Sequence, residues 1–216
     1  MTAFAVPIRP QPTVPVQGSD RPFPVRRILC VGRNYAAHAR EMGADGRDPP
    51  FFFTKPADAV VLPGADVPYP SATADLHHEI ELVAAIGEGG ALFGLAVGVD
   101  LTRRDLQNSF KARGQPWDAA KGFDASAPIS AIVPWTGPTP QGRITLSVNG
   151  VTKQDGAVAD MIWSLEEILV EAGKLWSLEA GDLIYTGTPE GVGPLVRGDR
   201  VEGSVEGVGA LAFTVV

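Results

Sequence analysis

The amino-acid sequence predicts a β-rich α+β fold with a few short helices. The chain contains 25 glycines and 19 prolines among 216 residues. This content is well above the usual share of roughly 12%, and it favours many short strands joined by turns. Only three modest stretches carry a helical pattern. They do not alternate regularly with strands, as a doubly wound parallel sheet requires.

The composition excludes several classes of protein. A chain of 216 residues can bury a large core within one domain. No apolar stretch approaches the roughly 20 residues that span a bilayer, so we expect no membrane partner. The formal net charge is −7 and there is no basic run, which argues against nucleic acid as a partner. Because the single cysteine cannot form an intramolecular disulfide and the opening lacks a secretory pattern, we expect a cytoplasmic protein.

The chain is expected to begin with an arm. Residues 1–25 contain six prolines, which favour an extended surface segment, and residues 26–216 are expected to form one domain. In its first half, apolar runs bounded by turn residues predict strands over 27–32, 51–53, 59–62, 79–86 and 91–99, with a short helix over 35–42. The last two strands flank Gly87-Glu88-Gly89-Gly90, which predicts a hairpin.

The second half carries two helix-start signals and another hairpin. Thr102 and Asp105 have the spacing of a capping box, which predicts the start of a helix. Ser164 and Glu167 predict a second helix in the same way. Asn149-Gly150 separates two strand-like runs and is the strongest short signal for a hairpin. The strands expected here cover 144–148, 151–154, 182–186, 201–205 and 210–216.

Two acidic residues stand at alternate positions of an expected strand. Because side chains alternate between the two faces of a strand, Glu79 and Glu81 share one face. Such a pair is either a solvated strand face or a site for a divalent cation, and carboxylates favour magnesium, manganese or calcium over zinc. Asp100 follows the apolar run 91–99 and is either a third ligand or an ordinary turn residue.

Three other polar sites each allow two interpretations, one structural and one functional. His38 and Glu41 share a face of the expected short helix, either as an inconsequential surface pair or as a carboxylate that orients a general base. Lys121 lies among small and apolar residues, where its ammonium group either reaches the surface or holds an oxyanion. The loop 186–194, which contains Thr188, either binds an anion or forms a plain turn.

Six stretches spread over nearly the whole chain carry a resemblance to a known family. They are 28–42, 51–58, 75–82 (Asp-Leu-His-His-Glu-Ile-Glu-Leu), 98–107, 117–128 and 181–194. In this order they resemble the fumarylacetoacetate hydrolase family, most closely its short bacterial fumarylpyruvate and acylpyruvate hydrolases. The sequence departs from the family between Ile86 and Gly98, where such proteins usually carry a longer segment.

The resemblance implies a roll of mixed β-sheets around a metal site, a small keto-acid substrate and a homodimer. The implied cofactor is Mg²⁺ or Mn²⁺, with Ca²⁺ as another occupant. The implied residue roles are metal binding by Glu79, Glu81 and Asp100, catalysis by His38, Glu41 and Lys121, and substrate binding by Arg104, Gln107 and Thr188.

The activity expected from this resemblance is metal-dependent hydrolysis of a carbon–carbon bond. The substrate would be an acylpyruvate, a 2,4-dioxo acid such as fumarylpyruvate, and the products pyruvate and a carboxylic acid. An oxaloacetate-type decarboxylase or an isomerase of an unsaturated keto acid on the same scaffold is the alternative. A non-catalytic binding protein that retains the fold is a third hypothesis.

Overall fold

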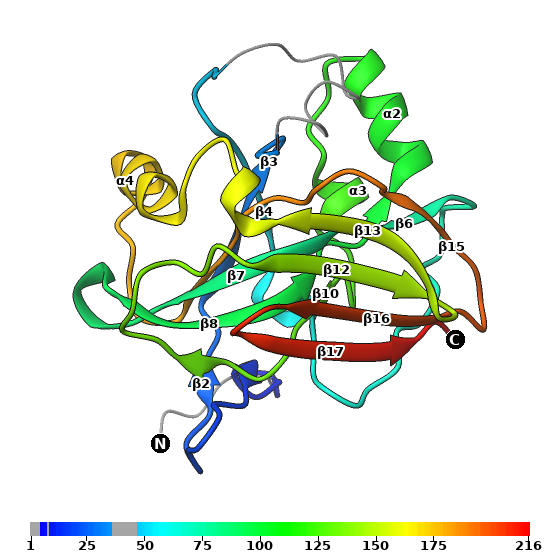
Figure 1. Cartoon of the computed structure of the whole chain (residues 1–216). Helices are drawn as coiled ribbons and strands as arrows, with labels where there is room; N and C mark the ends of the chain where they lie inside the picture. The colour runs from blue at the N-terminus through cyan, green and yellow to red at the C-terminus, as the bar shows by residue number, and fades with distance from the viewer. Residues whose placement is uncertain (1–4, 8, 36–46) are drawn as a thin grey trace.

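Two β-sheets pack against each other at the centre of the molecule (Figure 1). This computed structural model describes residues 5–7, 9–35 and 47–216. The strands of the larger sheet, in spatial order, are β11 (Val133–Pro134), β8 (Leu92–Val99), β7 (Ile80–Ile86), β14 (Asp182–Tyr185), β3 (Arg27–Gly32) and β4 (Phe51–Lys55). Those of the smaller sheet are β13 (Val151–Ala157), β12 (Arg143–Val148), β16 (Arg200–Val205) and β17 (Gly209–Thr214).

Short strands and helices surround these sheets in the described part of the chain. The remaining strands pair as β1 (Thr13–Val14) with β2 (Phe23–Pro24), β5 (Val60–Val61) with β10 (Ala127–Pro128), and β6 (Leu76–His78) with β9 (Thr102–Arg103) and β15 (Gly193–Leu195). The helices are α2 (Arg104–Ala112), α3 (Asp118–Lys121) and α4 (Leu165–Leu175), with single 3₁₀ turns η1 (Ala57–Ala59), η2 (Glu88–Gly90) and η3 (Val158–Asp160). None of the described helices is long and apolar enough to cross a membrane.

The predicted fold class is confirmed. Strands dominate the described residues, the helices are few and short, and the larger sheet is mixed because β14 pairs parallel with β3 and antiparallel with β7. The main core fills the space between the sheets, where Leu82 and Leu146 are fully buried. Each such side chain stabilises the fold by about 1.5–3 kcal/mol.

A second core lies on the other face of the larger sheet. Val14, Phe23 and Val25 of the N-terminal segment are buried there, in one cluster with Ile28 and Leu183 of the sheet. Because β7 is covered on both faces, all seven of its residues are buried.

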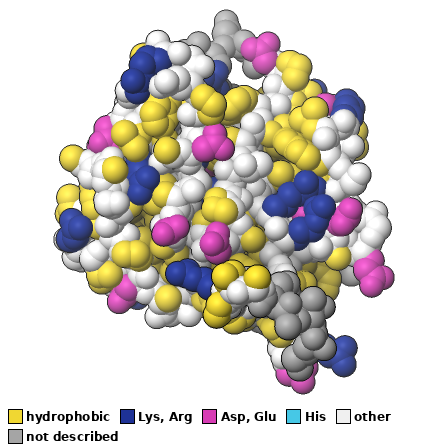
Figure 2. Space-filling view, turned by 180° about the vertical axis from the view of Figure 1, so that it is seen from behind, with side chains coloured by type: hydrophobic (Ala, Val, Ile, Leu, Met, Phe, Trp, Pro, Cys, Tyr) yellow, Lys and Arg dark blue, Asp and Glu magenta, His cyan; other side chains and the backbone are white. Residues whose placement is uncertain are grey.

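The division into an arm over 1–25 and a domain over 26–216 stays a prediction. On the face seen from behind, hydrophobic side chains are interspersed with acidic and basic ones (Figure 2).

The β7–β8 hairpin places Glu79, Glu81 and Asp100 at one end of the larger sheet. Glu81 of β7 is opposite Gly98 of β8, and a Cβ atom at Gly98 would lie only 2.6 Å from Tyr185 Cε1, so only glycine fits. At the other end, Gly87 N donates to Ala91 O at 2.8 Å and closes a tight connection. The connection between Gly87 and Ala91 is therefore remote from the acidic end of the hairpin.

One of the two predicted helix caps is confirmed and the other is wrong. Ser164 and Glu167 form a reciprocal capping box at the start of α4. In contrast, α2 begins at Arg104 without a side-chain cap, because Thr102 belongs to β9 and its hydroxyl contacts Glu79. Of the helix expected over 35–42, residues 36–42 lie outside the described residues.

Asp105 ties α2 to the preceding loop, and its replacement by asparagine is expected to destabilise the protein at neutral pH. Its carboxylate accepts bonds from Thr73 Oγ1 at 2.6 Å, Ala74 N at 3.0 Å and Leu106 N at 2.8 Å. Burial raises the pKa of this carboxyl, but the hydrogen bonds outweigh it and hold the pKa below the ordinary 3.8. The folded state thus favours the charged form, so the stabilisation is present above pH 3.8 and is lost as the pH falls through the lowered pKa.

We expect Asp105→Asn to cost about 1 kcal/mol at pH 7. Denaturant unfolding at pH 7 and at pH 2.5 measures the difference in the free energy of unfolding between this variant and the wild type. Asp20 is exposed, and Asp20→Asn serves as the control. A cost that stays the same at both pH values would contradict the electrostatic origin.

Candidate metal centre

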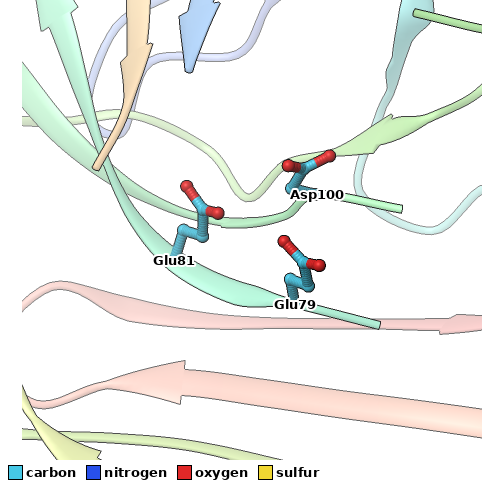
Figure 3. Close-up of side chains that lie close together, drawn as sticks. All are labelled: Glu79, Glu81 and Asp100. Carbon is cyan, nitrogen blue, oxygen red and sulfur yellow. The ribbon is translucent and has the colours of Figure 1, made fainter. Parts of the chain in front are cut away.

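Three carboxylates converge at the end of the β7–β8 hairpin (Figure 3). Glu79 lies between β6 and β7, Glu81 belongs to β7, and Asp100 directly follows β8. A bond from Asp100 N to Glu79 O, 2.8 Å long, fixes the two strand ends together. One oxygen from each carboxylate lies within 4.8 Å of the others, and all three side chains are buried. The fold therefore brings Glu79 and Glu81, which the sequence predicts on one face of a strand, together with Asp100.

The electrostatics of Glu81 favour a cation at this place. Burial, followed by the charges of Asp100 and Glu79, raises the pKa of Glu81 well above its ordinary value. Its carboxylate also accepts a bond from Gly187 N at 2.8 Å. An all-oxygen set of three buried carboxylates suits a hard divalent cation such as Mg²⁺ or Mn²⁺. The residues present thus fit the metal site that the sequence analysis implied.

Lys121 places its ammonium group directly on this cluster. Lys121 Nζ lies 2.9 Å from Glu79 Oε2, 2.7 Å from Asp100 Oδ2 and 2.6 Å from Thr102 Oγ1. Burial lowers the pKa of Lys121, but the charges of Asp100 and Glu79 outweigh this effect and raise it above the ordinary value. Lys121 therefore does not reach the surface. Its charged ammonium group is buried beside the triad, where it can stabilise an oxyanion.

Arg104 and Gln107 project from α2 toward the same carboxylates. Arg104 Nη2 donates to Glu79, and Arg104 Nη1 donates to Gln107 Oε1 at 2.5 Å. Asp105 on the same turn binds the 73–75 loop and so orients this part of the helix. A guanidinium group fixed in this way can bind a second carboxylate in a defined direction.

Lys55 is a site residue that sequence reasoning missed. Its fully buried Nζ lies 2.8 Å from Asp100 Oδ1 and also donates to Leu101 O at 3.1 Å. A lysine ending the apolar strand 51–55 was the available signal, of the same kind that drew attention to Lys121.

Replacing Lys55 by methionine is expected to destabilise the metal-free protein by about 3 kcal/mol, because it leaves a buried Asp100 charge with one cation fewer. Denaturant unfolding with and without Mn²⁺ measures the loss, and we expect Mn²⁺ to recover part of it. The exposed Lys153 on β13, as Lys153→Met, is the matched control. A loss no larger than that of the control would contradict a structural role for the Lys55–Asp100 pair.

Gln154 is a second missed residue, and it connects the site to the loop that contains Thr188. Gln154 Oε1 accepts from Ile80 N at 3.0 Å and lies 2.9 Å from His78 Nδ1. Gln154 Nε2 donates to Thr188 Oγ1 at 2.8 Å and to Pro189 O at 2.9 Å. Burial lowers the pKa of His78, which favours the neutral imidazole in this network.

One pocket joins most of the predicted site residues. It is lined by Val31, Gly32, Arg33, Phe53, Glu79, Glu81, Arg104, Gln107, Trp117, Lys121 and Thr188. Asp100 is not among these lining residues, but it belongs to the triad and accepts a hydrogen bond from Lys121 Nζ. A groove of about 590 Å³ adjoins the pocket and shares Phe53, Trp117 and Lys121 with it. His38 and Glu41 lie outside the described residues, and the roles of all these residues stay predictions.

Comparisons with known proteins agree with this geometry. Residues 27–216 match the family model described as "Fumarylacetoacetate (FAA) hydrolase C-terminal". The fumarylpyruvate hydrolase of Ralstonia sp is 44% identical over 176 residues, which cover 76% of this chain and 92% of that protein. The oxaloacetate tautomerase YcgM of Escherichia coli is 39% identical over 204 residues, which cover 88% of this chain and 93% of that protein.

A solved structure is similar over almost the whole length of both chains. The crystal structure of fumarylpyruvate hydrolase from Pseudomonas aeruginosa, in complex with Mn²⁺ and pyruvate, superposes with a TM-score of 0.94. Its sequence is 46% identical, and the match covers 99% of each chain.

Proposed function

The chain belongs to the fumarylacetoacetate hydrolase family, and from this premise we propose that it is a metal-dependent hydrolase that cleaves a carbon–carbon bond of an acylpyruvate such as fumarylpyruvate. The products are pyruvate and a carboxylic acid. The observation that carries the proposal is the buried triad with the Lys121 ammonium group on it, in a pocket shared with Arg104. The similar Pseudomonas aeruginosa enzyme, in complex with Mn²⁺ and pyruvate, supports it.

The proposed cofactor is Mg²⁺ or Mn²⁺, held by Glu79, Glu81 and Asp100. Such an ion, when bound, polarises a keto oxygen and holds an adjacent carboxylate. Hard oxygen ligands discriminate weakly between these two ions. Metal analysis of the protein as purified, followed by titration of each ion into the stripped protein, tests the assignment. A homodimer is part of the same proposal, and light scattering measures it.

The chain's own residues supply the remaining chemistry. His38, oriented by Glu41, takes a proton from water, and the hydroxide adds to the C4 carbonyl of the substrate. The bond between C3 and C4 then breaks and leaves pyruvate as its enolate, which takes the proton from His38 at C3 to give pyruvate. The ammonium group of Lys121 stabilises the negative charge that develops on the enolate oxygen. Arg104 and Gln107 orient the substrate through its carboxylate, and Thr188 contacts it from the opposite loop.

Oxaloacetate tautomerase is the second candidate function, because the similar YcgM protein carries that name. Tautomerisation moves a proton between carbon and oxygen without attack by water. The same pocket would suit it, since both reactions stabilise an enolate.

One experiment separates the candidates. The metal-stripped protein, with and without added Mn²⁺, is incubated with fumarylpyruvate, acetylpyruvate and oxaloacetate. Metal-dependent release of pyruvate with fumarate or acetate supports the hydrolase. Interconversion of the keto and enol forms of oxaloacetate, without cleavage of any acylpyruvate, would assign a tautomerase instead. Release of carbon dioxide from oxaloacetate alone would assign a decarboxylase.

A further inference from the structure

Arg33 has an unusual backbone conformation beside the candidate metal centre. Its φ is +63°, in the left-handed region that residues other than glycine rarely adopt. The neighbouring Asn34 is fully buried and fixes the backbone there, because Asn34 Nδ2 donates to Thr186 O at 2.8 Å and Asn34 Oδ1 accepts from Trp163 N at 2.8 Å. A strained residue held so firmly by its surroundings is typical of functional sites.

The guanidinium group of Arg33 differs from the other cations near the triad. Lys55, Lys121 and Arg104 each contact a carboxylate of the triad. Arg33 lines the same pocket, yet within the described part of the chain its buried Nε has no hydrogen-bond partner. No ion pair joins Arg33 to any described carboxylate either. The side chain is only partly buried, yet a buried N–H of a charged group without a partner costs free energy, and a bound anion relieves that cost.

The charges around the triad indicate what kind of anion fits. Within the described residues, the three carboxylates face the basic side chains of Lys55, Lys121 and Arg104, and these charges nearly cancel. A divalent cation and Arg33 then leave the filled pocket clearly positive. A substrate with two carboxylates neutralises this charge better than a substrate with one.

We infer that Arg33 binds the second carboxylate of the substrate, the one remote from the keto-acid group, and that the pocket thereby selects dicarboxylates. The inference rests on the proposed function, which places the keto-acid end at the triad with Arg104 and Lys121. Arg33 lines the same pocket and, among the described residues, pairs with none of the triad carboxylates, whereas Arg104 and Lys121 do. Phe53 and Trp117 also line the pocket, with ring centroids 6.2 Å apart, and offer apolar surface to the chain between the two ends.

The test compares two substrates that differ in the second carboxylate. Fumarylpyruvate has it, and acetylpyruvate lacks it. With Arg33→Met we expect kcat/KM for fumarylpyruvate to fall by about 10- to 100-fold, the usual effect of a lost charged hydrogen bond. For acetylpyruvate it should change by less than about 3-fold. Arg33→Gly serves as a second variant, because glycine adopts the positive φ without strain and keeps the fold.

Controls distinguish this inference from the proposed function. Arg197 is exposed and lies outside the pocket, so Arg197→Met removes the same charge elsewhere. We expect this control variant to leave kcat/KM unchanged for both substrates. Calorimetric titration of fumarate into the Mn²⁺-loaded protein provides a readout without turnover. If the wild-type protein cleaves neither substrate, the proposed function fails, yet weaker fumarate binding in both Arg33 variants still supports the inference. Equal losses on both substrates, or unchanged fumarate affinity, would overturn it.

Discussion

Replacing Glu81 by glutamine is expected to weaken binding of Mn²⁺ or Mg²⁺ by more than about 100-fold and to remove nearly all turnover. Loss of a residue that only supports a metal ligand typically costs about 10- to 100-fold in affinity, and a direct ligand costs more. Glutamine keeps the shape of the side chain and can still accept the bond from Gly187 N. The change therefore removes mainly the negative charge that the cation needs.

The same substitution should have the opposite effect on the metal-free protein. Because the pKa of Glu81 is raised, the folded state binds its proton more tightly than the unfolded state does. The charged carboxylate therefore destabilises the metal-free fold at neutral pH, and this destabilisation disappears as the pH falls through the raised pKa toward the ordinary 4.5. A neutral glutamine relieves it at every pH. We expect metal-free Glu81→Gln to be at least as stable as the wild type at pH 7.

Thermal unfolding with and without Mn²⁺ measures both effects. At a metal concentration of 100 Kd the wild type should gain about 2.7 kcal/mol, and the variant almost nothing. Glu88, exposed at the opposite end of the same hairpin, provides the control Glu88→Gln, which should behave as the wild type. If Glu81→Gln kept its metal-dependent stabilisation and its activity, the triad would not be the metal site.

Local patterns predicted the parts of the fold that depend on neighbours in sequence. The β7–β8 hairpin, the Asn149-Gly150 turn and the Ser164 capping box all arise from residues a few positions apart. The alternation of side chains along a strand placed Glu79 and Glu81 on one face, and the two residues do meet Asp100. Thr102 does not cap a helix as the spacing predicts, because its hydroxyl accepts a hydrogen bond from Lys121 Nζ in the polar cluster.

The remaining site residues depend on pairs that are distant in sequence. Lys55 contacts Asp100 from another strand, Gln154 reaches Ile80 across 74 residues, and Asn34 reaches Trp163 across 129. No local pattern shows which buried polar group will meet which, because the partners come together only when the sheets are formed. The one local signal is a polar residue within an apolar run, and Lys55 is such a residue.

Replacing His38 by alanine is expected to lower kcat for acylpyruvate cleavage by about 10²- to 10⁴-fold, the range usual for the loss of a general base. Metal affinity should stay nearly unchanged, because the proposed ligands are Glu79, Glu81 and Asp100. His38 lies outside the described residues, so this expectation rests on its spacing from Glu41 and on the family resemblance. Steady-state kinetics together with Mn²⁺ titration measure the two quantities in the same variant.

The role of Glu41 is tested by a double-mutant cycle. If Glu41 acts only by orienting His38, then Glu41→Gln should cost less than His38→Ala, and the double variant should be no slower than His38→Ala alone, because the orienting group has nothing left to orient. Additive losses would show that Glu41 acts on the substrate or on water by itself. A parallel fall in Mn²⁺ affinity in His38→Ala would instead make His38 part of the metal site, and the proposed division between base and ligands would be wrong.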